Sequence, residues 1–264
     1  MCIRDSLKAF GKYVLRGERS EGARYLMTHS FQKMQLEILD NCDVFLPNAK
    51  TEMDQIAAHL GFRTDNYVVV PNAVDVASIK AAKEVESTGY ERFSGWIVCI
   101  GRIDIRKNQL NLIKAVEGSD YKVVFVGKKS PGHIEYANKV VSEIEANPNM
   151  EWIEQIPNED IYKLCRECRV SVLPSWFETP GLVSLEAAAM GCNIVVSPKG
   201  TTRDYFGDSA FYCDVSSPSS IRAALDEAYG VNYDEVFGRK VITEYTWEKA
   251  AEKTLDGYQL ALKG

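Results

Sequence analysis

The sequence predicts an α/β fold built on a doubly wound parallel sheet of the Rossmann type. From residue 95 onward, short apolar runs alternate with amphipathic stretches, a pattern typical of parallel strands joined by crossover helices. The runs are almost continuously apolar, as expected for strands covered on both faces of a sheet. Ligands of such sheets bind outside the carboxyl ends of the strands, so the loops that follow the strands are the expected site.

The elements follow in a regular order. The expected strands are residues 96–101, 121–127, 150–156, 170–175, 193–198 and 210–214. The expected helices are residues 108–116, 133–146, 159–167, 182–190, a short segment after 202, and 219–229. A last helix is expected over residues 247–262.

The residues before 95 follow a different pattern. Helices are expected over residues 21–40 and 50–59, and short strands over 43–48 and 67–71. These two βα steps are too few for an independent domain of this class. The polar stretch 83–94 is the best linker candidate. The first six residues resemble translated sequencing-adapter DNA, and we give them no structural weight.

Composition excludes several classes of protein. The 264 residues are 45% hydrophobic, which is enough for a sizeable core, and a net charge of -6 does not indicate nucleic-acid binding. No apolar run approaches the roughly 20 residues of a membrane-spanning helix, and no signal-peptide core is visible. The seven cysteines lie largely in apolar segments, which suits a reducing cytoplasm. Cys165 and Cys168 form a lone CxxC that we interpret as structural, because no second half-site accompanies it.

The strongest motif is the stretch from Pro174 to Gly191, PSWFETPGLVSLEAAAMG. It reads as the end of a strand, a tight turn, and a helix with proline in its first turn and glycine at its end. The backbone N–H groups of Gly181, Leu182 and Val183 then point out of the helix N-terminus. That end carries partial positive charge and suits an anionic diphosphate.

Two glutamates accompany this turn. Glu178 precedes the helix and Glu186 lies one turn inside it, and a carboxylate can accept hydrogen bonds from the vicinal hydroxyls of a ribose or another sugar. The carboxyl groups of a glycosidase pair lie about 5–9.5 Å apart. Eight helical residues span about 12 Å, which disfavours that alternative, but the turn between the two glutamates leaves it open. Solvated helix-end charges are the other alternative, which the apolar neighbours of Glu186 disfavour.

A second motif follows the first strand of the regular region directly. In Gly101-Arg102-Ile103-Asp104-Ile105-Arg106-Lys107-Asn108, the residues Arg102 and Lys107 bracket a strand-to-helix loop. A guanidinium and an ammonium together can neutralise a diphosphate leaving group as its charge develops. A basic loop of this kind is common on protein surfaces, but this one is expected at the same sheet edge as the glutamates.

Together these motifs resemble the signature of the family-four retaining glycosyltransferases (glycosyl transferases group 1), which have the GT-B fold. Glu178 and Glu186 resemble its glutamate pair, and Gly101-Arg102 with Lys107 resembles its phosphate-binding loop. Pro71-Asn72-Ala73-Val74-Asp75 resembles the Pro-Asn-Gly-Val-Asp segment that enters the donor domain. Tyr245-Thr246-Trp247 resembles the start of the helix that crosses back to the N-terminal domain.

The resemblance implies a GT-B-type architecture with one complete Rossmann-like donor domain and a partial N-terminal Rossmann-like domain. Residues 1–75 would be the remnant of the acceptor domain, residues 76–245 the donor-binding domain, and residues 246–264 the helix that crosses back. It also implies transfer of a sugar from a UDP- or GDP-linked donor to a saccharide or lipid acceptor, in cell-surface polysaccharide biosynthesis. Donor configuration would be retained by front-face attack assisted by the leaving phosphate, with no metal and no cofactor.

The implied roles transfer residue by residue. Arg102 and Lys107 would bind the diphosphate, and Glu186 the ribose hydroxyls. Glu178 would be catalytic, holding sugar hydroxyls near the reacting centre. The backbone of Gly181, Leu182 and Val183 would contact sugar and phosphate.

The sequence departs from the family pattern at two points. Ala73 stands where the family has glycine. Family members also begin with a full acceptor domain that carries a glycine-rich loop and a histidine, and none of His29, His59 and His133 matches that histidine. We therefore expect the chain to be a gene fragment that performs no transfer by itself. A non-catalytic nucleotide-sugar-binding fragment is the main alternative, and a GT-B nucleotide-sugar epimerase, disfavoured by the glutamate pair, is another.

The N-terminal stretch is basic, with Lys8, Lys12, Arg16 and Arg19. A solvated helix face is the favoured interpretation. The alternative is peripheral contact with an anionic membrane surface, since many relatives make such contact through the acceptor domain. The expected location is the cytoplasm, with the inner face of the membrane as that alternative.

Overall fold

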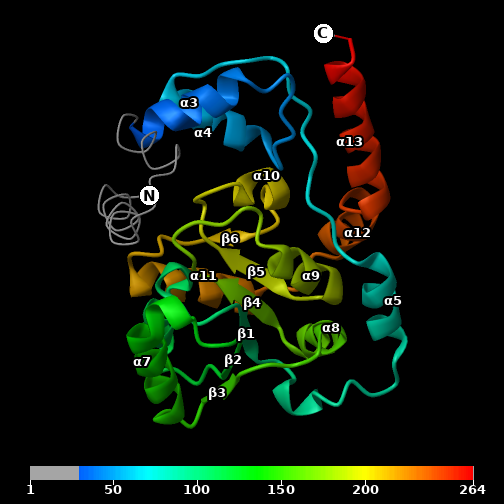
Figure 1. The fold of residues 1–264 in the computed structure, drawn as a ribbon. Helices are drawn as coiled ribbons and strands as arrows, with labels where there is room; N and C mark the ends of the chain where they lie inside the picture. Colours follow the sequence, from blue (N-terminus) through cyan, green and yellow to red (C-terminus); the bar gives the residue numbers. More distant parts are fainter. Residues whose placement is uncertain (1–29, 264) are drawn as a thin grey trace.

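The computed structural model describes residues 30–263, and its centre is a parallel sheet (Figure 1). The strands are β1 (Ile97–Ile100), β2 (Val123–Val126), β3 (Met150–Ile153), β4 (Val170–Leu173), β5 (Asn193–Val196) and β6 (Phe211–Tyr212). Their order in the sheet is β3-β2-β1-β4-β5-β6 and every pairing is parallel. The order reverses between β1 and β4, which is where ligands of doubly wound sheets bind. The predicted fold class is confirmed.

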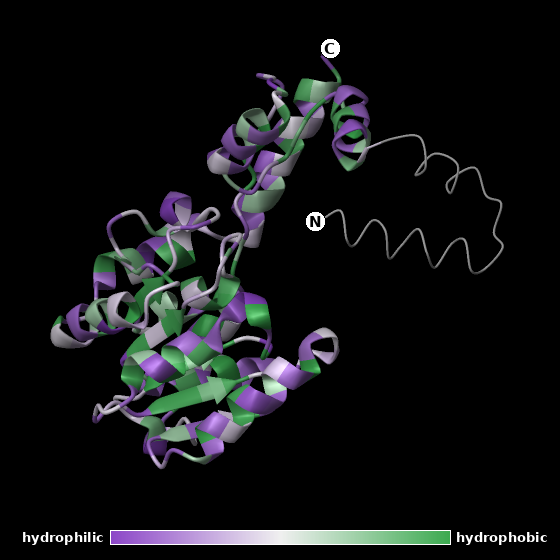
Figure 2. Cartoon of the chain, turned by 90° about the vertical axis from the view of Figure 1, so that its left-hand side faces the viewer, coloured by the Kyte–Doolittle hydropathy of each residue, from purple (hydrophilic) through white to green (hydrophobic). Residues whose placement is uncertain are grey.

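Helices cover both faces of the sheet, because alternate strand residues point to opposite sides. Ile97 and Cys99 of β1 pack into one core with α6 (Gln109–Val116), α7 (Ile134–Glu145) and α11 (Pro218–Gly230). Val98 and Ile100 pack into the other core with helices of the opposite face, namely α5 (Val76–Glu84), α8 (Asn158–Glu167), α9 (Leu182–Met190) and α12 (Glu235–Glu244). Figure 2 shows the apolar strands between these two layers.

Two helices of the second layer were not anticipated. α5 and α12 have modest apolar patterns among many polar residues, yet Ile79 and Val241 are fully buried in the core. The prediction that residues 83–94 form a linker is wrong for a related reason. These residues contain the end of α5 and the short 3₁₀ helix η1 (Glu91–Phe93), and the Phe93 side chain is completely buried. The buried Phe93 ring packs this polar segment against the core that α5, α8, α9 and α12 share.

The segment before α5 forms a separate layer above the sheet (Figure 1). It contains α3 (Phe31–Asp40) and α4 (Lys50–Leu60). The strands predicted over 43–48 and 67–71 are reduced to one isolated parallel bridge between Phe45 and Tyr67. Backbone bonds join these extended segments, with Val68 N donating to Phe45 O at 3.0 Å and Val70 N to Pro47 O at 2.8 Å. Among residues 30–263, this short pair has no neighbouring strands of the kind that stabilise a ladder.

A tyrosine pair connects this segment to the rest of the chain. The Tyr205 hydroxyl of α10 (Thr202–Phe206) accepts from Asn72 N at 2.9 Å and donates to Asn48 O at 2.8 Å. The Tyr245 hydroxyl donates to Tyr205 O at 3.1 Å, and Tyr245 O accepts from Val74 N at 2.9 Å. Beyond Tyr245, α13 (Trp247–Ala261) runs up to the N-terminal segment, and its Gly257 lies directly against Leu46.

Several sequence-based expectations fall on residues that the structure does not describe. The first part of the helix predicted over 21–40, His29, and the basic stretch of Lys8, Lys12, Arg16 and Arg19 all lie outside residues 30–263. Within that range, none of the helices combines the length and apolarity needed to cross a bilayer.

We predict that Tyr205→Phe lowers the stability of the fold. Tyr205 is 2% exposed, and removing its hydroxyl leaves the Asn72 N–H and the Asn48 carbonyl without that partner. Orphaned buried groups of this kind cost about 1–3 kcal/mol. Thermal and urea unfolding measure the change, and Tyr258→Phe, at a 60% exposed position, is the control. Equal stability of the Tyr205→Phe and Tyr258→Phe variants would show that the hydroxyl does not hold the segment.

Candidate nucleotide-binding site

The loop after β1 is fixed by its own polar side chains. The Asp104 carboxylate caps the 3₁₀ helix η2 (Ile105–Lys107) by accepting from Lys107 N at 3.1 Å. Asn108 then adopts a left-handed conformation with φ 60°, which asparagine tolerates better than most residues. Its side-chain amide donates to Pro174 O at 3.1 Å and to Val215 O at 2.8 Å. Asn108 therefore fastens this loop to the chain beyond β4 and beyond β6.

The loops after β1, β4 and β5 are also joined through their backbones. Trp176 N donates to Arg106 O at 2.9 Å, and Thr201 N donates to Glu178 O at 3.0 Å. Glu178 forms an isolated parallel bridge with Gly200. Gly200 has φ +93°, and a Cβ there would overlap the Glu178 carbonyl, so only glycine allows this approach. Three loops of the carboxyl edge thus form one connected unit.

The N-terminus of α9 opens onto this unit. Gly181 is its N-cap residue with φ 81°, and no side chain caps the helix. The first N–H groups of a helix have no partner within the helix and carry partial positive charge. A Cβ on Gly181 would lie 3.9 Å from the Cβ of Glu178 and 3.7 Å from Ser184 Oγ. The helix N-terminus and the loop carboxylate are therefore immediate neighbours.

An ion pair spans the edge between the β1 and β4 loops. Lys107 Nζ lies 2.6 Å from Glu178 Oε1, and the two side chains are 13% and 7% exposed. The guanidinium of Arg106 lies 3.5 Å from the same oxygen and donates to Phe177 O at 3.0 Å. A buried carboxylate is tolerated when cations and hydrogen bonds surround it. The structure thus brings Lys107 and Glu178 together at the carboxyl edge of the sheet, where the sequence predicts both of them.

Glu186 lies on the only partly open strip of α9. Ser184, Leu185 and residues 187–190 are buried, whereas Leu182 is 39% exposed and Val183 and Glu186 are half-buried. The Tyr162 hydroxyl of α8 donates to Glu186 Oε1 at 3.2 Å. Burial raises the pKa of the Glu186 carboxyl, the Tyr162 hydrogen bond lowers it, and the nearby charge of Asp75 raises it again.

Unpartnered hydroxyls mark the same place. Among the described residues, the buried side-chain polar atoms without a hydrogen-bond partner are those of Ser175, Ser184 and Thr201. Ser175 follows β4, Ser184 lies in the first turn of α9, and Thr201 is bonded through its amide to Glu178. Such atoms are rare in folded proteins and call for an explanation. Their grouping at one sheet edge is consistent with a polar ligand site there.

The other predicted residues lie at this edge with less contact. Arg102 is exposed directly after β1, and its carbonyl accepts from Gln109 Nε2 at 2.9 Å. Its guanidinium makes no hydrogen bond or ion pair with another described residue. His59 and His133 are exposed. Among residues 30–263, no group of three or more potential metal-ligating side chains is present.

Sequence reasoning missed two side chains of the site. Arg106 lies inside the basic motif and was not singled out, although its neighbour Lys107 was. Tyr162 lies 24 positions from Glu186 and, within the amphipathic pattern of α8, looks only like a core residue. The position of Arg106 next to Lys107 could have indicated that it belongs to the site. No local pattern in the sequence indicated Tyr162.

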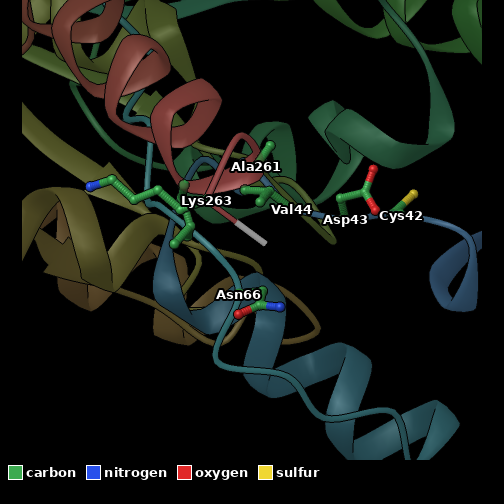
Figure 3. A pocket seen from close by; sticks show the side chains of 7 residues that line it. Cys42, Asp43, Val44, Asn66, Ala261 and Lys263 are labelled. Carbon is green, nitrogen blue, oxygen red and sulfur yellow. The ribbon is translucent and has the colours of Figure 1, made fainter.

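Two cavities lie elsewhere in the described chain. One of about 460 Å³ is lined by Cys42, Asp43 and Val44 with Asn66 and the end of α13 (Figure 3). Another follows the side of α13 near Pro71 and Trp247. Neither contains the glutamates or the basic loop. We therefore assign the site by the position of its charged groups at the strand ends rather than by the size of a cavity.

Comparison with known proteins identifies the family. The family model described as glycosyl transferases group 1 matches residues 91–232. A D-inositol 3-phosphate glycosyltransferase of Paenarthrobacter aurescens is 25% identical, over 94% of this chain and 63% of its own length. The chain spans 63% and 57% of the lengths of two D-inositol 3-phosphate glycosyltransferases and 48% of the length of an uncharacterized glycosyltransferase of Methanocaldococcus jannaschii.

Solved structures agree with the fold. A glycosyltransferase from Rickettsia africae superimposes with a TM-score of 0.76 at 14% identity, covering 99% of this chain and 82% of that protein. An Anabaena protein crystallised with UDP and glucose superimposes with a TM-score of 0.68 at 14% identity, covering 88% of this chain and 68% of that protein. At these identities the likeness shows the fold, which is of the GT-B type. With the family model matched across the sheet and both loops, the chain belongs to the glycosyl transferases group 1 family.

Proposed function

We propose that this chain binds the nucleotide diphosphate sugar donor of a retaining glycosyltransferase, which transfers a UDP- or GDP-linked sugar to a saccharide or lipid acceptor. The observation that carries the proposal is the Lys107–Glu178 ion pair of 2.6 Å beside the uncapped N-terminus of α9. It places cations, free amide donors and carboxylates at the point where the strand order reverses. That combination matches a ligand with a diphosphate and several hydroxyls.

The proposed roles follow from charge and position. Arg102 and Lys107 bind the diphosphate, together with the amides of Gly181, Leu182 and Val183. Glu186 accepts hydrogen bonds from the ribose hydroxyls. Glu178, held in place by its ion pairs, accepts hydrogen bonds from the sugar.

The reaction that these groups would support is a displacement at the anomeric carbon. The acceptor oxygen bonds to that carbon on the face that the leaving group occupies, and the bond from the carbon to the phosphate oxygen breaks. The acceptor proton passes to the departing phosphate. Positive groups aimed at the leaving diphosphate stabilise the charge that develops there. We propose that no metal or cofactor takes part in the transfer. We also propose that the transfer serves cell-surface glycan synthesis and takes place on the cytoplasmic side of the membrane.

We predict that Arg102→Ala and Lys107→Ala each weaken binding of UDP or GDP. Charge-assisted hydrogen bonds of this kind contribute on the order of 1.5–3 kcal/mol. Titration calorimetry measures the affinity. Lys114→Ala, which removes an exposed lysine from α6, is the control for loss of positive charge.

Lys107→Ala also leaves Glu178 with Arg106 as its remaining cation, so each variant is first checked for an intact thermal transition. Arg102 has no such structural contact and gives the cleaner result. Unchanged affinity in both variants would contradict the phosphate-binding role.

We also predict that Glu186→Gln weakens binding of UDP or GDP more than binding of pyrophosphate. Pyrophosphate lacks the ribose that the carboxylate is proposed to contact, and a hydrogen bond to a charged group contributes about 1.5–3 kcal/mol. Calorimetry with both ligands gives the comparison. Equal losses for the two ligands would assign Glu186 a structural role instead.

A further inference from the structure

Glu186 is a carboxylate on a helix that is otherwise mostly buried. Apart from Glu186, α9 consists of apolar and small residues, and its residues 187–189 are fully buried. Glu186 itself is half-buried. A carboxylate in such surroundings needs donors to remain charged. Within the described chain, the donor that reaches it is the Tyr162 hydroxyl, at 3.2 Å from Oε1.

Tyr162 is firmly placed for this contact. It lies in the middle of α8, is 7% exposed, and packs in the core that α5, α8 and α9 share. Packing alone would be met by phenylalanine. The hydroxyl makes its hydrogen bond to Glu186, and a phenol so enclosed normally has a partner.

Two influences oppose the charged form of Glu186. Burial is the larger and raises its pKa, and the Asp75 carboxylate raises it further. Asp75 is held by its own partners, because it caps α5 and accepts from Ser78 N at 3.0 Å and Ser78 Oγ at 2.7 Å. The hydrogen bond from Tyr162 acts in the opposite direction. Besides burial, the groups that influence the pKa of the Glu186 carboxyl are thus Tyr162 of α8 and Asp75 at the start of α5.

The geometry also determines which part of the carboxylate is available. Oε1 accepts from Tyr162, which leaves Oε2 and the second lone pair of Oε1 for other donors. Because the strip of Leu182, Val183 and Glu186 is the partly open part of α9, those lone pairs are the ones that a ligand at the helix N-terminus can use. A carboxylate fixed at one oxygen is preorganised for a diol at the other.

We propose that Tyr162 is a positioning residue that holds the Glu186 carboxylate toward the ribose diol, and so sets the preference for ribonucleoside diphosphates over ligands without that diol. The inference rests on the proposed function, since it assumes that a nucleotide occupies this edge. It assigns Tyr162 no contact with the ligand itself.

The test uses Tyr162→Phe with Tyr90→Phe as the matched control. Tyr90 also donates its hydroxyl to a carboxylate of α8, Asp160, at 3.1 Å, but not to Glu186. Calorimetry compares UDP, its 2′,3′-dideoxy analogue and pyrophosphate. We expect Tyr162→Phe to lose about three- to tenfold in affinity for UDP, as one hydrogen bond is worth, and to keep its affinity for the other two ligands. Tyr90→Phe should match the unmodified chain.

A pH series and a double variant separate positioning from simple loss of structure. Without the Tyr162 hydroxyl, the pKa of Glu186 rises further, so the deficit for UDP should grow as the pH falls. In the Glu186→Gln background, Tyr162→Phe should cause no additional loss. If Tyr162→Phe does not fold, 3-fluorotyrosine at position 162 replaces it. Its stronger donor should move the pH midpoint of UDP binding downward.

The outcomes are distinct. Equal loss for UDP and pyrophosphate, no greater loss than in Tyr90→Phe, or an unmoved pH midpoint with 3-fluorotyrosine would overturn the role of Tyr162 alone. Failure of the unmodified chain to bind UDP, GDP or pyrophosphate would overturn the proposed function, and the role of Tyr162 with it.

Discussion

The ion pair between Lys107 and Glu178 joins the two loops between which a ligand of this sheet would bind. Its partners come from the ends of β1 and β4, 71 positions apart in the chain, and meet at 2.6 Å with little exposure to solvent. Removing one partner of such a pair leaves a buried charge and commonly costs 3–5 kcal/mol. The surrounding contacts reinforce the placement, because Asn108 fixes one loop and the bridge to Gly200 fixes the other. The same two side chains therefore hold the two loops together, and in the proposed function they also contact the ligand.

This arrangement divides the site into two carboxylates with different supports. Glu178 is compensated by cations, Lys107 and Arg106. Glu186 is compensated by a neutral hydroxyl, that of Tyr162, and has an acidic neighbour in Asp75. Burial raises the pKa of the Glu186 carboxyl, the hydrogen bond from Tyr162 lowers it, and the charge of Asp75 raises it again. Two glutamates of one helix-and-turn motif thus have different partners because of the elements packed around them.

Local patterns in the sequence were sufficient to predict the strands of the sheet and their order along the chain. The alternation of apolar runs and amphipathic stretches predicted each strand of the sheet, and α9 begins and ends at the residues expected, Leu182 and Met190. Where the structure differs from these predictions, the reason is packing between segments that lie far apart in the sequence. Within residues 30–263, the segments 43–48 and 67–71 have strand-like composition but pair only with each other. The polar stretch 83–94 is held by the buried ring of Phe93 and by the buried Thr88, whose hydroxyl donates to Glu167. For the site, shared position at a sheet edge placed Lys107 with Glu178, but no spacing rule connects Tyr162 to Glu186 across two helices.

We propose that a nucleoside diphosphate binds at the edge formed by η2, the turn at Glu178 and the N-terminus of α9. The most direct measurement is a crystal structure of the chain with UDP or GDP. We expect the diphosphate beside Arg102, Lys107 and the amides of Gly181, Leu182 and Val183, with the ribose hydroxyls on Glu186. A nucleotide bound instead in the cavity between α13 and residues 42–44, with the Lys107–Glu178 edge empty, would contradict this assignment.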